Sequence, residues 1–333
     1  MAKWERIISE EDVGLGCRID RYLARTESDM SRSKWKKLLK FGRVTVNGKP
    51  CRPADMVKSG DDLRVDEGGF ILDQRLMPAP LPLSILHEDE DVLVLDKPAG
   101  VVVHPGSGTK ETTLIEGVAN YLGDSFLLAF TAEMGTDRGQ GSLRPGIVHR
   151  LDKDTSGVMV IAKNRMSSES LSTQFKDRSN LREYWALLRG VPKERKWETE
   201  SLIRRHPGNR LKFQAVKITD DENQSRGYRY ARSFFEVINV FPDSFTLVKV
   251  RLGTGRTHQI RVHGEYLGLP VVGDEVYGRA ADGRRFLGVA RQLLHGKALG
   301  FIHPRSNKKL VFSSRLPKDF KEALVRLGCR FDA

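Results

Sequence analysis

A polar loop next to an apolar segment carries the residues best suited to chemistry. Residues 149–157 (HRLDKDTSG) precede the apolar segment 158–162, and loops held by rigid strands often bear catalytic groups. Asp152 lies between two basic residues, and a carboxylate at its ordinary pKa of about 4 is ionised and available as nucleophile or base. In the alternative interpretation, Asp152 or Asp154 caps backbone N–H groups in an Asx-turn. The residue pattern by itself leaves both interpretations open.

Several nucleotide- and metal-binding motifs are absent from the sequence. The segment at Gly106 lacks the GxxxxGK[ST] order of a P-loop, the glycines at 253–255 have no third glycine for a dinucleotide fingerprint, and neither GxSxG nor HExxH occurs. His258 and His263 are five residues apart and point to different faces of a helix, which makes a poor metal pair. We interpret both, and His149, as structural hydrogen-bonding groups. We expect no metal and no nucleotide cofactor.

Five segments resemble the motifs of one known enzyme family. The loop at 149–157, with its Arg-Leu-Asp triplet, resembles the signature loop of the RluA-type pseudouridine synthases, in which the aspartate of the triplet is catalytic. The other four segments follow in the family's order and span residues 85–106, 182–187, 255–278 and 294–304. Residues 1–68 are similar to the alpha-L RNA-binding module of ribosomal proteins. The sequence is thus identified as a member of this family.

The resemblance implies that the protein converts uridine in RNA to pseudouridine. The base is cut from the ribose at N1, rotated and rejoined through C5, a reaction that consumes no cofactor. A base inside a helix cannot be reached, so the target uridine is expected to flip into a pocket. Asp152 is then the nucleophile or base, and whether it attacks the ribose, attacks the uracil ring or removes a sugar proton stays open.

The resemblance also implies roles for three further residues. Arg261 matches the family arginine that pairs with the aspartate and would hold it ionised, and Arg256 is the less favoured candidate. Tyr184 matches the tyrosine that lies against the flipped base; the alternative is an aromatic core residue on a strand. Arg150 is interpreted as a wedge or phosphate contact, with a surface salt bridge to Asp154 as the alternative.

Two basic stretches are candidates for RNA contact. Residues 31–52 contain eight Lys and Arg and no acidic residue, and a helix is predicted from residue 32 to about 41. A solvated helix face is the alternative, but the basic stripe continues into the following turn, which favours RNA binding. The candidates here are Arg32, Lys36, Lys40 and Arg43. The second stretch resembles the family's hairpin that grips an RNA stem, and its candidates are Arg204, Arg205 and Arg210.

The elements that position these residues are predicted to form two domains. We expect an RNA-binding module at 1–68, a Pro/Gly-containing linker at 69–82 and a catalytic domain at 83–333. Strands interrupted by single helices, without βαβ alternation, indicate an α+β fold with a mixed, largely antiparallel sheet. Residues 123–146 hold five glycines and are expected to form a loop. A short strand is expected at 147–148.

Composition and charge narrow the function classes. The 333-residue chain has 56 Lys and Arg against 43 Asp and Glu, a net charge of +13 that favours a polyanionic partner. Three scattered cysteines favour neither a disulfide framework nor a zinc site, and no apolar run is long enough for a membrane span. We expect a cytoplasmic monomer.

Within this framework the substrate is the most open question. The sequence most resembles family members that act on large-subunit ribosomal RNA, so ribosomal RNA is the expected partner. Transfer RNA is the alternative substrate. A non-catalytic RNA-binding or ribosome-assembly factor on the same scaffold is the alternative function, and it would have no need for Asp152, Tyr184 and Arg261 together.

Overall fold

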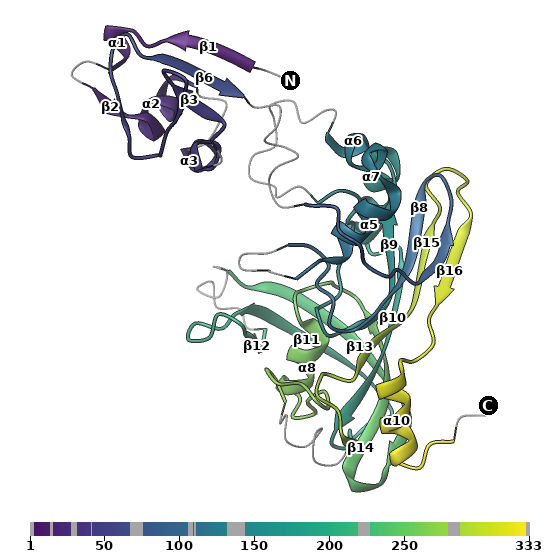
Figure 1. Ribbon diagram of the computed structural model, residues 1–333. Coiled ribbons are helices and arrows are strands. Elements are labelled where there is room, and N and C mark those ends of the chain that lie inside the picture. Colours follow the sequence, from purple (N-terminus) through teal and green to yellow (C-terminus); the bar gives the residue numbers. More distant parts are fainter. Residues whose placement is uncertain are drawn as a thin grey trace. The chain divides into compact units, whose positions relative to one another are not determined.

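The structure is a computed structural model that divides into two compact units (Figure 1). One unit comprises Met1–Ala79 with Ala119–Pro145, and the other comprises Pro80–Val118 with Gly146–Ala333. The expected boundaries at 1–68, 69–82 and 83–333 stay a prediction, because much of the expected linker lies outside the described residues. The described residues are 3–13, 16–27, 32–40, 42–66, 76–105, 109, 111–131, 144–218, 227–278 and 287–330.

The first unit is a small α/β module. Its four-stranded sheet has the order β1-β6-β3-β4, and β2 pairs with β5 beside it. Its elements are β1 (Lys3–Ile7), α1 (Glu10–Val13), β2 (Cys17–Arg18), α2 (Ile19–Thr26), α3 (Arg32–Lys40), β3 (Val44–Val46), β4 (Lys49–Pro50), β5 (Met56–Val57) and β6 (Asp62–Asp66). Asn47 and Gly48 both have positive φ, 51° and 77°, the conformation that lets an Asn-Gly pair make the tight turn between β3 and β4.

Two amphipathic helices fill the core of this module. Tyr22 and Leu23 of α2 pack with Trp35 and Leu38 of α3, and all four side chains are fully buried. Helix formation places these apolar residues on one face of each helix, and burying that face fixes both helices on the sheet. Helix α6 (Asp124–Thr131) also belongs to the first unit. The predicted loop at 123–146 is therefore wrong over α6, where the apolar run FLLAF forms a helix; residues 132–143 lie outside the described residues.

The second unit is built on one ten-stranded sheet. Its order is β12-β11-β13-β14-β10-β15-β9-β8-β7, with β16 paired to β15. The strands are β7 (Ile85–Glu88), β8 (Val92–Lys97), β9 (Ser156–Ala162), β10 (Leu181–Arg189), β11 (Lys196–Arg205), β12 (Phe213–Val216), β13 (Arg229–Phe241), β14 (Phe245–Leu252), β15 (Leu294–Ile302) and β16 (Lys309–Ser313). Only β9 and β15 pair in parallel among the described strands, so the expected α+β class with a mixed, largely antiparallel sheet is confirmed.

Two helices of the second unit pack on strands of this sheet. Helix α7 contacts β9 and β15, and α8 contacts β11, β12 and β13. The described helices of the second unit include α7 (Arg165–Asp177), α8 (Gln259–Tyr266) and α10 (Lys318–Arg326), and α5 (Leu114–Leu122) crosses the boundary between the two units at Ala119. Asn164 begins α7 by accepting a 2.9 Å bond from the Ser167 backbone N–H, and Arg178 ends it in the left-handed region, with φ 61°. No described helix has the length and apolar character needed to cross a membrane.

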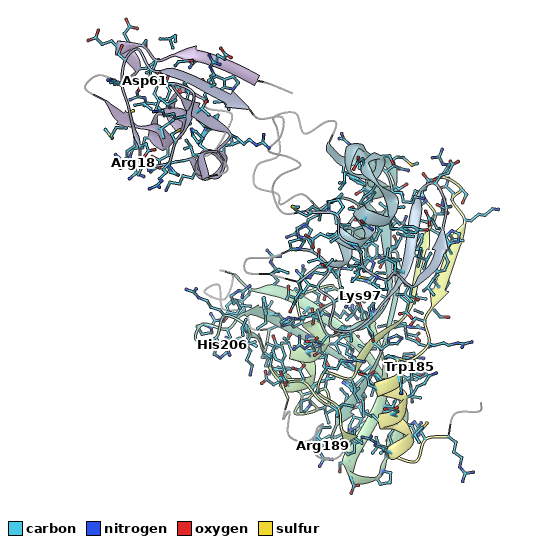
Figure 2. All side chains as sticks on the ribbon, viewed as in Figure 1. Arg18, Asp61, Lys97, Trp185, Arg189 and His206 are labelled. Carbon is cyan, nitrogen blue, oxygen red and sulfur yellow. The ribbon has the colours of Figure 1, made fainter. Side chains whose placement is uncertain are left out.

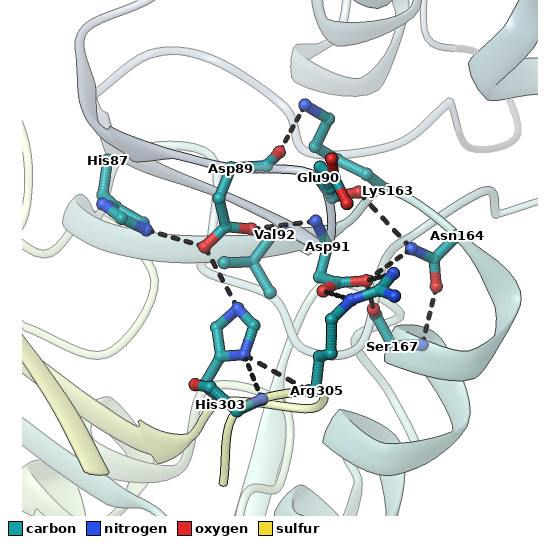
Figure 3. A network of polar contacts seen from close by, with 11 residues as sticks. His87, Asp89, Glu90, Asp91, Val92, Lys163, Asn164, Ser167, His303 and Arg305 are labelled. Atoms are coloured by element: carbon teal, nitrogen blue, oxygen red, sulfur yellow. Dashed lines mark hydrogen bonds and ion pairs between the residues drawn. The ribbon is translucent and has the colours of Figure 1, made fainter. Parts of the chain in front are cut away.

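A polar network fixes one end of the second unit (Figure 3). Arg305 donates to both Asp91 carboxylate oxygens, at 2.6 and 2.9 Å, and Asn164 donates to the same carboxylate at 2.9 Å. The Arg305 hydrogen bond holds the pKa of Asp91 low, at about 2. Because Asp91 precedes β8 and Asn164 precedes α7, the network joins the β7–β8 turn to α7 and to the segment after β15.

The predicted strand at 147–148 is wrong. Ile147 makes only an isolated bridge to Ile161, and the chain then enters the loop at 149–157. The loop's end is held where Gly157 meets Gly296 in the parallel β9–β15 pair. Gly157 has φ +125°, and a Cβ there would lie 2.2 Å from the Gly296 oxygen. Glycine at 157 is therefore required for the two backbones to approach, which anchors the loop to β15.

Candidate active site

A cavity of about 550 Å³ opens in the second unit beside the loop at 149–157. Its walls come from that loop, the end of α7, the start of β10 and the segment at 252–261. Asp152, Tyr184, Arg261 and Arg150 all line it, so the structure brings these four predicted residues to one place. The cavity is therefore the candidate active site.

Asp152 and Arg261 form an ion pair in this cavity. Arg261 Nη1 donates to Asp152 Oδ2 at 3.0 Å, with the Arg261 side chain 7% exposed and that of Asp152 17% exposed. Arg256 is turned elsewhere, and its Nε donates to the Tyr230 carbonyl at 2.9 Å. In the described residues, no backbone N–H donates to the Asp152 carboxylate, as an Asx-turn would require. An ionised carboxylate held by a guanidinium is thus available to the cavity.

Arg261 is itself held by Asp274, a residue that sequence reasoning did not single out. Arg261 Nε and Nη2 donate to the two Asp274 oxygens at 2.6 and 2.9 Å, and Asp274 is fully buried. These bonds raise the pKa of Arg261 against the effect of burial. Two parallel bonds fix the plane of the guanidinium, which leaves Nη1 directed at Asp152. Asp274 lies in the segment at 255–278 that carries the family resemblance, but its role depends on a contact that only the fold creates.

His258 faces the other oxygen of Asp152 and is hydrogen-bonded to Tyr277. The His258 Nε2 atom is 3.9 Å from Asp152 Oδ1, and its Nδ1 is 2.8 Å from the Tyr277 hydroxyl. The Phe213 backbone N–H donates to that hydroxyl at 2.8 Å, so the hydroxyl proton is left for His258 Nδ1. Burial lowers the pKa of His258. A neutral ring that accepts at Nδ1 carries its proton on Nε2, which faces the carboxylate.

Tyr184 lies on β10 at the inner side of the cavity. Its pKa is raised by burial, so the phenol is neutral at physiological pH. The ring packs with the core of the sheet while also lining the cavity. The two interpretations made from the sequence, core aromatic and base contact, are therefore compatible in one side chain.

Lys97, which is labelled in Figure 2, binds the loop backbone next to Asp152. Lys97 is fully buried, and its Nζ donates to the carbonyls of Pro98, Val101 and Lys153 at 2.8, 2.9 and 2.9 Å. Burial lowers its pKa to about 7. Arg291 Nη1 adds a 2.9 Å bond to the Asp154 carbonyl. These bonds use the loop's carbonyl groups and leave the Asp152 carboxylate to Arg261 and the cavity.

Of the predicted RNA-contacting residues in the second unit, Arg150 lines the cavity and is exposed, whereas Arg204, Arg205 and Arg210 are not among the residues that line it. Arg204 and Arg205 end β11 and stack over the rings of Tyr228 and Phe213, at 4.7 and 4.9 Å. Arg210 is exposed in the following turn. Stacking holds the two guanidinium groups in place beside a polar surface.

In the first unit, two of the predicted RNA-contacting side chains, Arg32 and Lys36, lie beside a buried carboxylate. Arg32 Nη2 lies 2.9 Å and Lys36 Nζ 3.7 Å from Asp20, whose side chain is fully buried. Both cations are also solvent-accessible, so they stabilise Asp20 and still present charge to solvent. Arg43 is half buried, and the side chain of Lys40 lies outside the described part of the chain.

One group of residues has the chemistry of metal ligands. Ligand atoms of Asp89, Asp91 and His303 lie within 4.8 Å of one another. Asp89 accepts from His87 and His303 at 2.9 and 3.0 Å, while Asp91 is bound by Arg305 (Figure 3). A cation would have to displace these donors, so the group fits a structural network better than a metal centre.

Comparisons with known proteins identify both units. The RNA pseudouridylate synthase family model matches residues 91–266, and the S4 domain model matches residues 17–63. The uncharacterized RNA pseudouridine synthase YlyB of Bacillus subtilis is 38% identical over 93% of this chain and 94% of its own length. The ribosomal large subunit pseudouridine synthase D of Neisseria meningitidis is 37% identical over 96% of this chain and 81% of its own length.

A solved structure agrees with the sequence relatives. The human RNA pseudouridylate synthase domain containing 4 superposes with a TM-score of 0.56 at 25% identity, covering 75% of this chain and 95% of the human one. The matched family model spans the loop that carries Asp152, the strand that carries Tyr184 and the helix that carries Arg261. The chain belongs to the RluA-type RNA pseudouridine synthases and bears an S4 domain at its N-terminal end.

Proposed function

We propose that this enzyme isomerises specific uridines of large-subunit ribosomal RNA and that Asp152 carries the reaction. The observation on which this depends is the Asp152 carboxylate, fixed by Arg261 at 3.0 Å in a cavity that Tyr184 also lines. The large-subunit substrate is supported by the Neisseria relative, whose name states that substrate and which matches nearly the whole chain. The S4 domain supplies a second RNA-binding unit, as expected for a large structured RNA.

The proposed reaction follows from the groups that face the cavity. The target uridine leaves its stack and enters the cavity, where Tyr184 lies against the base. The N1–C1′ bond breaks, the uracil rotates, and a C5–C1′ bond forms; the C5 proton is lost and N1 gains one, so no atom or electron is exchanged overall. Asp152 acts as nucleophile or base, and the hydrogen bond from Arg261 orients its carboxylate. The isomerisation is balanced without a cofactor.

The test is a map of pseudouridine in ribosomal and transfer RNA that lack the modification. Purified wild-type protein, Asp152→Asn and Asp243→Asn are each incubated with both RNAs, and Asp243 serves as a matched control because it is exposed in the β13–β14 turn. We expect new pseudouridine in large-subunit RNA from the wild type and Asp243→Asn only. Modification confined to transfer RNA would replace the proposed substrate. RNA binding without any product from the wild type would support the non-catalytic alternative.

A further inference from the structure

Arg182 is a half-buried cation whose guanidinium has no hydrogen-bond acceptor among the described residues. It lies on β10, two residues before Tyr184, and lines the same cavity. Its Nε is buried and makes no hydrogen bond, and no acceptor for its other nitrogens is found in the described part of the chain. A buried N–H donor without an acceptor is costly, so this guanidinium is expected to have a partner in the functional state.

The surroundings of Arg182 hold it in place without neutralising it. Its guanidinium lies 5.9 Å from the centre of the Phe175 ring. A Cβ at Gly255 would come within 2.8 Å of Arg182 Nη1, so the absence of a side chain at 255 leaves room for the guanidinium. Stacking and a glycine wall fix the orientation of the fork of donors, and neither supplies a negative charge.

The other charges of the cavity are also mostly positive. Among the described residues, Asp152 is the one carboxylate that lines it, and Arg261 already binds that carboxylate. The remaining basic residues that line the cavity are Arg150, Lys176, Arg178 and Arg256. A cavity with this excess of cations attracts an anion, and a planar guanidinium matches the oxygens of a phosphate by paired hydrogen bonds.

We propose that Arg182 binds a backbone phosphate of the RNA strand inside the cavity, next to the nucleotide that occupies the site. The ligand class is a phosphodiester, and this assignment rests on the proposed function only in taking RNA as the ligand. Arg182 thus differs from Arg204, Arg205 and Arg210, which lie on the hairpin away from the cavity. Binding the phosphate here supplies the missing acceptor and fixes the strand relative to Asp152 and Tyr184.

The experiment measures binding of pentauridylate to the full chain as a function of salt. The variants are Arg182→Gln, Arg182→Lys and the matched control Arg195→Gln, which removes an exposed arginine outside the cavity lining. We expect Arg182→Gln to weaken binding by roughly tenfold or more and to reduce the slope of log K against log salt by about 0.7, the value of one phosphate contact on a single strand. Arg182→Lys should keep the slope, and Arg195→Gln should match the wild type.

A scan of the RNA identifies the contact. Pentauridylates with one linkage at a time replaced by a neutral methylphosphonate should show one position that weakens the wild type strongly and Arg182→Gln hardly at all. Equal effects on both proteins at every linkage, an unchanged affinity of Arg182→Gln, or no binding by the wild type would overturn the proposal. Because the readout is binding, a loss in Arg182→Gln would stand even if no pseudouridine were formed, and normal catalysis with unaltered binding would refute only this inference.

Discussion

At the scale of single residues, the candidate site is a chain of contacts that directs one carboxylate. Asp274 holds two nitrogens of Arg261, Arg261 offers its third to Asp152, and His258 faces the remaining Asp152 oxygen. Asp152 and Arg261 were identified from the sequence because the family resemblance assigns them. The roles of Asp274, His258 and Tyr277 could not be predicted, since each acts through a hydrogen bond to a residue distant in sequence.

Replacing Asp274, which does not line the cavity, should slow the reaction because Arg261 loses its partner. Asp274→Asn removes the negative charge and one of the two acceptor oxygens that the buried Arg261 binds. We therefore expect the free energy of unfolding to fall by about 3 kcal/mol. The reaction rate should fall at least tenfold because Nη1 is no longer held toward Asp152. Urea unfolding and single-turnover kinetics measure the two effects, with Asp243→Asn as control. A variant that is destabilised but reacts at the wild-type rate would exclude the positioning role.

Tyr277→Phe tests the link between the β12 hairpin and the catalytic loop. The change removes the hydroxyl that the Phe213 N–H and His258 Nδ1 share, and should cost about 1–3 kcal/mol of stability because a backbone donor loses its acceptor. It also releases the His258 tautomer, so the pH dependence of the rate should change while RNA affinity stays the same. An unaltered pH profile would show that His258 does not act on Asp152 through this bond.

At the scale of elements, the catalytic loop is positioned by strands that meet at a glycine contact. The apolar runs of β8, β9 and β14 are characteristic of buried strands and can be recognised in the sequence. No such run marks β11, which is rich in charge, or β15, which two glycines interrupt. These strands exist because their neighbours supply backbone partners, and pairing between distant segments leaves little trace in local composition.

Gly157→Ala should destabilise the protein far more than an alanine at another glycine of positive φ. Both Gly157 and Gly100 lie in the left-handed half of φ space, but a Cβ at 157 meets the Gly296 backbone at 2.2 Å, whereas a Cβ at 100 meets nothing within 4 Å. We expect Gly100→Ala to cost about 1 kcal/mol from backbone strain, and Gly157→Ala about 3 kcal/mol or more because β9 and β15 must separate. Thermal melting compares the two. Equal losses would show that the close approach is not required.

At the scale of the whole molecule, the chain combines an RNA-binding module with a catalytic unit. The charge pattern and the motifs predict both parts, and the S4 and synthase family models match separate segments of the chain. Helix α6 was missed because neighbouring glycines obscured its short apolar run. The surroundings of three histidines, the half-buried His149 and the buried His263 and His295, also depend on packing that sequence does not reveal.

Acid should unfold the protein through these histidines. Burial lowers the pKa of His149 to about 3 and of His263 and His295 to about 4, from an ordinary value of 6.5. Below pH 6.5 the unfolded chain binds protons that the folded chain refuses, so stability is complete above that pH and is lost as pH falls toward 4. Each histidine should contribute a slope of up to about 1.4 kcal/mol per pH unit.

The measurement is urea unfolding between pH 7.5 and 4.5. His263→Gln should reduce the slope by about the contribution of one proton while keeping the bonds to Ser201 and Ser233 possible. A wild-type stability that does not change across this window would contradict the assignment.

The central claim, that the Asp152 carboxylate carries the isomerisation, is tested most directly by single-turnover kinetics at saturating RNA, with RNA affinity measured in parallel. Asp152→Asn keeps the size of the side chain and removes its charge, so we predict that it binds the RNA as tightly as the wild type and forms no pseudouridine. Asp243→Asn should react at the wild-type rate. Pseudouridine formation by Asp152→Asn at a rate close to that of the wild type would contradict the claim.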